Sequence, residues 1–290
     1  MLKRVGADGL LVDGLRFVIM SEFDLVMDVV VHRSIDSTNN WCLQQSKAGK
    51  ALPFVCFAER QTSGRGRRGK HWFMPSNNIA MSLVWPFALS EQSLHLLPLS
   101  IAMAIVAALE SFGVKQVQVK WPNDVYVQGK KIAGILIETQ PVKNGRVNGA
   151  GSGKQVAVVI GLGLNYRVED REQINVGEPL LLTDVCEQIA LQKIAIKPDR
   201  NSVAAALLCN VIAVCQDFKQ AAEQRLEKFR ASYDFCEQKQ VDVILDNKEI
   251  LSGIAQGVNE NAELLVLIDG ELRAFNSAEV SVRPGEAVNL

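Results

Sequence analysis

Residues 120–138 read KWPNDVYVQGKKIAGILIE, and the fold is most clearly indicated by this stretch and the residues beside it. Three short runs have strand character: Val117–Trp121, Val125–Val127 and Ile132–Glu138. Pro122-Asn123-Asp124 and Gln128-Gly129-Lys130 separate them, and these residue types favour tight turns. The stretch therefore predicts short strands joined by turns in a central mixed or antiparallel sheet.

Outward from this stretch, further strands and helices alternate along the chain. Strands are predicted at Val29–Val31, Pro53–Glu59, Asn78–Trp85 and Val156–Leu164. Helices are predicted after Ser37 and Thr38, which are good N-caps, and over Leu94–Phe112 and Asn201–Arg230. Residues 141–155 are rich in glycine and predict an exposed hairpin loop. The pattern is typical of an α+β protein.

The chain divides into three parts. Residues 1–20 show no clear period and are interpreted as an irregular N-terminal arm. Residues 21–234 carry the mixed pattern and form the main domain. Residues 235–290 contain only short strand-like runs joined by polar turns, which predicts a small barrel-like β domain.

Composition narrows the class of protein. The chain has 290 residues, 48% hydrophobic content and a formal net charge of −1, which fits a soluble globular protein and disfavours nucleic-acid binding by charge alone. Its six cysteines form no CxxC pair, so buried thiols in a reducing compartment are expected. No signal peptide is evident, and Pro98 and Ser100 interrupt the longest apolar stretch. A cytoplasmic protein without a membrane span is predicted.

Two glycine motifs do not fit the nucleotide-binding loops that they suggest. Residues 64–69, GRGRRG, match GxGxxG, but the following KHWFMPSNN has no helical character, as a dinucleotide-binding fold would require. Residues 149–155, GAGSGKQ, lack the first glycine and the hydroxyl residue of a P-loop. Neither motif is interpreted as a phosphate loop of these folds.

The loop from Arg65 to His71 gathers cations in a chain of almost no net charge. Three interpretations are open: a solvated surface loop, contact with a nucleic-acid backbone, or a mobile clamp over a small anion. Other segments favour the clamp, because Lys131 and Gly134 follow the Lys120–Asp124 turn and two glycines lie on one face of Ile160–Asn165. Simple alternation places Lys131 and Gly134 on opposite faces, so a shared site requires a bulge or a strand end at Lys131.

Together these segments resemble the biotin protein ligase family. The stretches that carry the resemblance are DSTN at 36–39, ERQTSGRGRRGKHW at 59–72, residues 120–138, and VVIGLGLNY at 158–166. The resemblance implies a catalytic domain similar to class II synthetases, followed by a small SH3-like barrel. It also implies that biotin and ATP form biotinyl-5′-adenylate with Mg²⁺, and that biotin then passes to a lysine of the biotin carboxyl carrier domain of acetyl-CoA carboxylase.

The resemblance also implies a role for individual residues. Lys131, Arg65 and Asp124 are the expected catalytic residues; Asp124 would help the acceptor lysine lose its proton, or it forms only the turn. The expected biotin contacts are Ser37, Thr38, Asn39, Gln61, Arg65, Gly66, Arg67, Lys131 and Gly134. The expected nucleotide contacts are Arg65, Arg67, Trp72, Asn123, Lys131 and Asn165. No metal site formed by protein side chains is expected.

Some points stay open at this level. About 35 residues precede the DSTN segment and show no helix–turn–helix pattern, so the single-function ligase form, without DNA binding, is expected. A lipoate or octanoyl ligase or transferase of the same architecture is the nearest alternative, and a nucleic-acid-binding regulator is a more distant one. The sequence does not show the oligomeric state.

Overall fold

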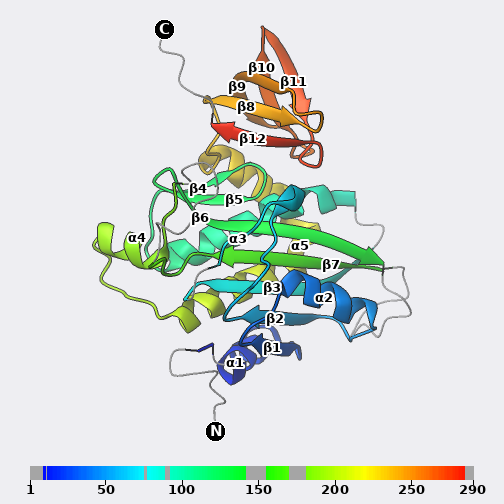
Figure 1. Ribbon diagram of the computed structural model, residues 1–290, viewed down its shortest axis with the longest axis vertical. Coiled ribbons are helices and arrows are strands. Elements are labelled where there is room, and N and C mark those ends of the chain that lie inside the picture. Colours follow the sequence, from blue (N-terminus) through cyan, green and yellow to red (C-terminus); the bar gives the residue numbers. More distant parts are fainter. Residues whose placement is uncertain are drawn as a thin grey trace.

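The computed structural model describes residues 9–10, 12–74, 77–88, 92–141, 155–169 and 181–284. Its main element is a seven-stranded sheet with the order β1-β2-β3-β7-β6-β5-β4 (Figure 1). The strands are β1 (Asp28–His32), β2 (Phe54–Ala58), β3 (Ile79–Ala88), β4 (Val117–Lys120), β5 (Asp124–Val127), β6 (Lys130–Pro141) and β7 (Gln155–Leu164). Only the β1–β2 pair is parallel among these described pairings. The predicted mixed sheet is confirmed.

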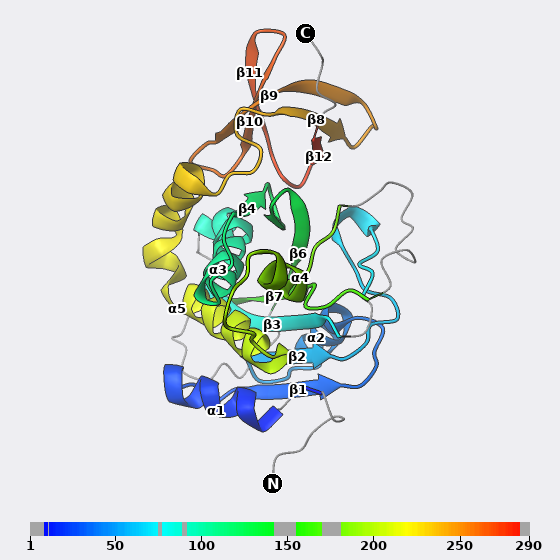
Figure 2. The same cartoon turned by 90° about the vertical axis from the view of Figure 1, so that its left-hand side faces the viewer.

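Helices cover both faces of this sheet (Figure 2). They are α1 (Val12–Phe23), α2 (Thr38–Lys47), α3 (Leu97–Ser111), α4 (Val185–Leu191) and α5 (Arg200–Ser232), with 3₁₀ turns η1 (Arg67–Gly69) and η2 (Gln92–Leu96). Strand β2 shows how the faces are divided: Val55 and Phe57 belong to the large core with α3 and α5, whereas Phe54 and Cys56 pack with Cys42 of α2. Alternate residues of a strand point to opposite faces, so a strand buried on both sides is apolar throughout.

Two helical stretches, Ser93–Ser111 and Arg200–Ser232, are long and apolar enough to cross a membrane by composition. In the structure α3 and α5 pack against each other beside the sheet, and 67% and 50% of the apolar windows of the two stretches are buried. Core helices of globular proteins have the same composition, so these stretches do not by themselves indicate a membrane protein.

A β-bulge lies in β6, where it pairs with β5. Val125 pairs with Ala133, but the next residue of β5, Tyr126, pairs with Lys131, so Ile132 is the extra residue. A bulge changes the alternation of side chains along a strand. Simple alternation would place Lys131 and Gly134 on opposite faces of the strand, and the bulge brings them to the same face. A Cβ added at Gly134 would accordingly lie 3.4 Å from Cε of Lys131.

The C-terminal part forms a five-stranded antiparallel sheet with the order β11-β10-β9-β8-β12. Its strands are β8 (Gln240–Leu245), β9 (Ile250–Val258), β10 (Leu264–Ile268), β11 (Glu271–Phe275) and β12 (Val280–Pro284). Figure 1 shows this domain beyond β4, at the end of the molecule opposite α1. Two adjacent side chains of the larger domain bond to its backbone: Lys120 Nζ donates to Val282 O at 2.7 Å, and Trp121 Nε1 donates to Ala262 O at 2.8 Å.

Three expectations need correction or fall outside the described chain. Residues 1–20 are not irregular throughout, because α1 spans Val12–Phe23 and buries Leu15 and Ile19, which are four residues apart on one helical face. The helix predicted from Asn201 begins one residue earlier, at Arg200, and Asp199 caps it, since its side chain accepts the Ser202 N–H. The glycine-rich loop predicted over residues 141–155 lies almost entirely outside the described residues, as does the rejected P-loop motif.

Candidate active site

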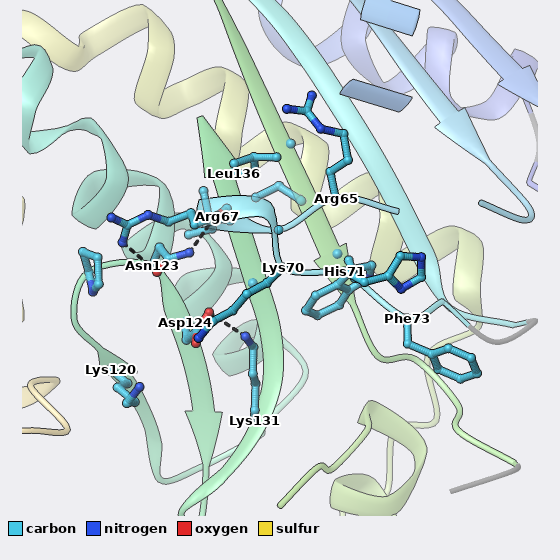
Figure 3. A pocket seen from close by; sticks show the side chains of 18 of the residues that line it. Arg65, Arg67, Lys70, His71, Phe73, Lys120, Asn123, Asp124, Lys131 and Leu136 are labelled. Carbon is cyan, nitrogen blue, oxygen red and sulfur yellow. Dashed lines mark hydrogen bonds and ion pairs between the residues drawn. The ribbon is translucent and has the colours of Figure 1, made fainter. Parts of the chain in front are cut away.

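A cavity of about 780 Å³ opens between the large sheet, the loop of residues 64–72 and the C-terminal domain (Figure 3). Every residue predicted for the site lines it: Ser37, Thr38, Asn39, Gln61, Arg65, Gly66, Arg67, Trp72, Asn123, Asp124, Lys131, Gly134 and Asn165. These residues come from five separate segments of the chain. The fold therefore brings the sequence motifs together in one place.

The lining is strongly cationic. The basic residues are Arg65, Arg67, Arg68, Lys70, Lys120, Lys131 and Arg283, whereas Asp124 is the one acidic residue that lines the cavity in the described part of the chain. Converging cations stabilise negative charge, above all where water is partly excluded. The described chain holds no group of three or more His, Cys, Asp or Glu side chains that could bind a metal ion. The cavity is suited to an anionic ligand.

Lys131 and Asp124 form an ion pair in the cavity. Lys131 Nζ lies 2.7 Å from Asp124 Oδ1, and 16% and 20% of the two side chains are exposed. The same Nζ lies 5.3 Å from the centre of the Trp72 ring. Residues 124 and 131 lie on the neighbouring strands β5 and β6, and the bulge aims the lysine toward the site. A free oxyanion in the cavity would meet this ammonium group.

The arginine loop folds back on itself as a narrow hairpin. Gly66 N donates to Lys70 O at 2.7 Å, and Trp72 N donates to Gly64 O at 2.8 Å. A Cβ added at Gly64 would lie 2.4 Å from Trp72 O, so the closeness of the two chain segments requires glycine at this position. The turn contains η1 and no α-helix, as expected from the rejection of the dinucleotide motif.

The three arginines of the loop have different partners. Arg65 donates from both terminal nitrogens to Glu138 at 2.9 Å, and its side chain points away from Lys131 and Asp124 (Figure 3). Arg67 donates to Asn123 Oδ1 at 3.3 Å. In this structure Glu138 binds the Arg65 guanidinium, and Arg65 lines the cavity as predicted, while its catalytic role stays a prediction.

Arg67 and Arg68 also attach the loop to the C-terminal domain. Arg67 donates to the backbone oxygen of Ser277, and Arg68 forms an ion pair with Asp246 in the turn between β8 and β9. Burial lowers the pKa of the Arg67 guanidinium from its ordinary value, with Asp124 opposing that effect. Sequence reasoning did not find these contacts, because the partners lie about two hundred residues further along the chain.

Polar groups at the start of α2 line another part of the cavity. The backbone N–H and the hydroxyl of Thr38 donate to Gln61 Oε1 at 2.8 and 3.1 Å. Ser37 caps the helix, and its extended backbone carries the chain into the site. Ser82, on β3, lies with its Oγ 2.7 Å from Thr38 Oγ1 and 2.6 Å from Asn39 Oδ1. These are hydroxyl and amide groups that can recognise a small polar ring.

The glycine face of β7 is filled by side chains of the protein itself. A Cβ added at Gly161 would lie 2.0 Å from Asn39 Oδ1, and one added at Gly163 would lie 2.3 Å from Cε2 of Trp72. Gly134, the register partner of Gly163, also borders the Trp72 ring. These glycines thus allow two candidate ligand-binding side chains to lie directly on the sheet.

Asn123 and Asn165 hold the local backbone as well as lining the cavity. Asn123 Nδ2 donates to Ile135 O at 2.7 Å, and Asn165 Nδ2 donates to Thr183 O at 3.1 Å.

Four residues in or beside the site were not predicted from the sequence: Ser82, Glu138, Lys120 and Arg283. Lys120 and Glu138 are the two ends of the 120–138 motif, so the motif itself contained a signal for them; Ser82 and Arg283 lie in ordinary strand sequence.

Comparison with known proteins gives two family matches, which together cover most of the residues that line the cavity. A model described as the biotin/lipoate A/B protein ligase family matches residues 31–165, and one described as the biotin protein ligase C terminal domain matches residues 239–283. The bifunctional ligase/repressor BirA of Escherichia coli (strain K12) is 33% identical over 263 residues, which are 89% of this chain and 75% of that protein.

One further relative and one solved structure are similar to this chain over most of its length. The biotin–[acetyl-CoA-carboxylase] ligase of Mycobacterium tuberculosis (strain ATCC 25618 / H37Rv) is 28% identical over 260 residues, with 88% of each chain covered. The solved structure of the biotin protein ligase from Aquifex aeolicus in complex with biotin and ATP superposes with a TM-score of 0.69 at 23% identity. The match covers 89% of this chain and 99% of that chain, and it confirms the expected fold.

Proposed function

The chain belongs to the biotin protein ligase family, and we propose that it activates biotin with ATP and transfers it to a lysine of the biotin carboxyl carrier domain of acetyl-CoA carboxylase. The observation that carries the proposal is the cationic cavity that all the predicted site residues line together with Lys131. The family relationship supports the reaction class, and the cavity supplies the residues for it.

In the first step, a carboxylate oxygen of biotin attacks the α-phosphorus of ATP. A bond forms between that oxygen and phosphorus, and pyrophosphate leaves with the electron pair of the broken P–O bond. Two anions must approach each other, so the transition state depends on fixed positive charge. Lys131, which is paired with Asp124, supplies this charge in the cavity, and Arg67 belongs to the same lining.

In the second step, the amine of the acceptor lysine attacks the acyl carbon of the adenylate. The C–N bond forms, the C–O bond to phosphate breaks, AMP leaves and the nitrogen loses a proton. Asp124 is our candidate for accepting that proton, because it is the acidic residue of the described lining. A carboxylate can act as a general base, and this one lies beside the lysine that would face the reacting oxygens.

An acyl adenylate is lost by hydrolysis wherever water reaches it. The loop of residues 64–72 covers one side of the cavity, and Trp72 places an apolar ring against Gly163 and Gly134. A covering loop that excludes water is a recognised way to protect such an intermediate. We assign that task to this loop.

Magnesium fits the site only as a companion of the nucleotide. Asp124 is already paired with Lys131, and the described residues offer no ligand cluster, so phosphate oxygens and water would hold the ion. When bound, Mg²⁺ supplies further positive charge to the phosphates. The residues of the chain would orient the nucleotide, and Lys131 would still supply fixed charge at the reacting oxygens.

The decisive experiment incubates the purified protein with ATP, Mg²⁺, biotin and a biotin carboxyl carrier domain. We expect biotin-dependent release of pyrophosphate and attachment of biotin to a single lysine of the carrier domain. Lipoate and octanoate in place of biotin test the nearest alternative within the same architecture. No pyrophosphate release with biotin, or a clear preference for lipoate, would overturn the proposal.

A further inference from the structure

Glu138 joins three parts of the site that are far apart in sequence. Its Oε1 accepts from the Arg65 guanidinium at 2.9 Å, and its Oε2 accepts from Arg65 at 2.9 Å and from Asn39 Nδ2 at 3.0 Å. Arg65 belongs to the loop that covers the cavity, Asn39 to the first turn of α2, and Glu138 to β6. We propose that Glu138 is a positioning residue that couples closure of the arginine loop to the shape of the biotin pocket.

The contact with Arg65 fixes the loop in direction as well as in distance. A guanidinium that donates two parallel hydrogen bonds to one carboxylate is held in a single plane. The same guanidinium also donates to Asn40 Oδ1 at 2.8 Å, so it bridges β6 and α2. The first residues of the loop are thereby attached to the two elements that form the polar end of the cavity.

The contact with Asn39 fixes the orientation of an amide. A carboxylate only accepts hydrogen bonds, so it requires the amide nitrogen of Asn39 on its own side. The Asn39 carbonyl oxygen then faces the Ser82 hydroxyl at 2.6 Å and lies over Gly161. An amide turned the other way would offer a different pattern of donors and acceptors to a bound ligand. The same nitrogen also donates to Leu136 O at 3.3 Å, so Glu138 and this backbone oxygen together determine which way the Asn39 amide faces.

Glu138 itself does not line the cavity, so its effect passes through Arg65 and Asn39. Loss of its charge would weaken the attachment of the loop and of the Asn39 amide at the same time, leaving Arg65 its bond to Asn40 and the amide its bond to Leu136 O. This inference rests on the proposed function, since biotin is the ligand whose pocket Asn39 lines. Binding of biotin should therefore suffer more than binding of ATP.

The test measures biotin-dependent pyrophosphate release by wild-type protein, Glu138→Gln and Arg65→Lys. The first variant keeps the shape of the side chain without its charge, and the second keeps the charge without the paired hydrogen bonds. For both variants we expect the KM for biotin to rise about tenfold or more, and for Glu138→Gln, which keeps the Arg65 side chain, the KM for ATP should change less than about threefold. Glu271→Gln, which removes an exposed ion pair with Arg273 in the C-terminal domain, is the matched control and should leave both values unchanged.

A second measurement reports on the loop without any catalysis. Limited trypsin digestion of the unliganded protein should cut after the loop arginines several times faster in Glu138→Gln than in wild type, with an unchanged melting temperature. An active wild type whose Glu138→Gln variant shows the same KM for biotin and the same digestion rate overturns this inference alone. A wild type without biotin-dependent pyrophosphate release overturns the proposed function and this inference with it.

Discussion

Lys131 Nζ lies 2.7 Å from Asp124 Oδ1, so the ammonium group is paired before any ligand enters the cavity. An ammonium group has three hydrogens to donate, and one bond to Asp124 leaves donors for a ligand oxygen. The pair keeps a charged lysine in a half-buried position, where an unpaired charge is unfavourable. A ligand anion can therefore join an existing arrangement, and the lysine does not have to move into place.

Replacement of Lys131 by Ala should abolish most adenylate formation while the fold survives. The variant removes the fixed charge beside the reacting oxygens, and loss of one such group costs about 100- to 1000-fold in rate. Lys131→Arg, which keeps the charge on a different shape, should retain more activity. Biotin-dependent pyrophosphate release measures the rate, and thermal melting checks the fold. Full activity of Lys131→Ala would contradict the role of this residue.

Gly161→Ala should weaken biotin binding through Asn39. The new Cβ would lie 2.0 Å from Asn39 Oδ1, so the amide must move away from its place over the sheet. We expect the Kd for biotin, measured by calorimetry, to rise at least about tenfold, which is about 1.4 kcal/mol. In an Asn39→Ala background the same change should cost much less, because the side chain that it displaces is gone. Equal costs in both backgrounds would disprove this explanation.

Asp246→Asn should loosen the arginine loop only slightly. The Asp246 side chain is 71% exposed, and ion pairs at such positions contribute about 0–1 kcal/mol. The KM for biotin should rise by at most about fivefold at low salt, and the difference should shrink at about 1 M salt because the pair is screened. Asp217→Asn, which breaks the Arg225 pair on α5, serves as the control and should have no effect. An effect that is independent of salt would point to another cause.

Asp234→Asn should change how stability depends on pH. Burial raises the pKa of Asp234 to about 6, and the hydrogen bond that Oδ1 accepts from the Cys236 N–H at 2.8 Å only partly opposes this rise. Oδ2 has no hydrogen-bond partner among the described residues. Between about pH 4 and 6 the folded protein binds a proton that the unfolded chain releases. The free energy of unfolding therefore falls as pH rises through this window.

The asparagine variant lacks this contribution. Relative to wild type, Asp234→Asn should gain about 2 kcal/mol between about pH 4.5 and pH 7.5, because at pH 4.5 the unfolded carboxyl has already lost most of its proton and part of the effect of the raised pKa is gone. Urea denaturation of both proteins at the two pH values gives the difference. If the two proteins differ in free energy of unfolding by the same amount at both pH values, the prediction of a raised Asp234 pKa is wrong.

Local features of the sequence predicted most of the fold. Runs such as Phe54–Ala58 have strand composition, and Gly113, with a φ of +86°, follows α3 as expected of a helix end. Helices α1 and α4 were missed because their patterns are weak: α1 contains a glycine and several β-branched residues, and α4 has only seven residues. Such short or unfavourable helices depend on tertiary packing, which local patterns do not contain.

The candidate site, like the fold, was predicted only in part from local sequence. Motifs located its lining residues, and the need for a bulge or a strand end at Lys131 followed from alternation alone. The partners of the loop arginines were not predictable, since Arg65 pairs with Glu138 and Arg68 with Asp246, far along the chain. Long-range pairs between charged side chains leave no periodic trace in the sequence, and only the folded geometry selects them.

Lys120 and Trp121 bind the C-terminal domain through the backbone oxygens of Val282 and Ala262. A backbone oxygen is present whatever side chain a residue carries, so substitutions at these two acceptor positions leave the acceptor atoms in place. Side-chain substitutions at Val282 and Ala262 that preserve the path of the main chain should therefore leave both of these contacts to the small domain in place.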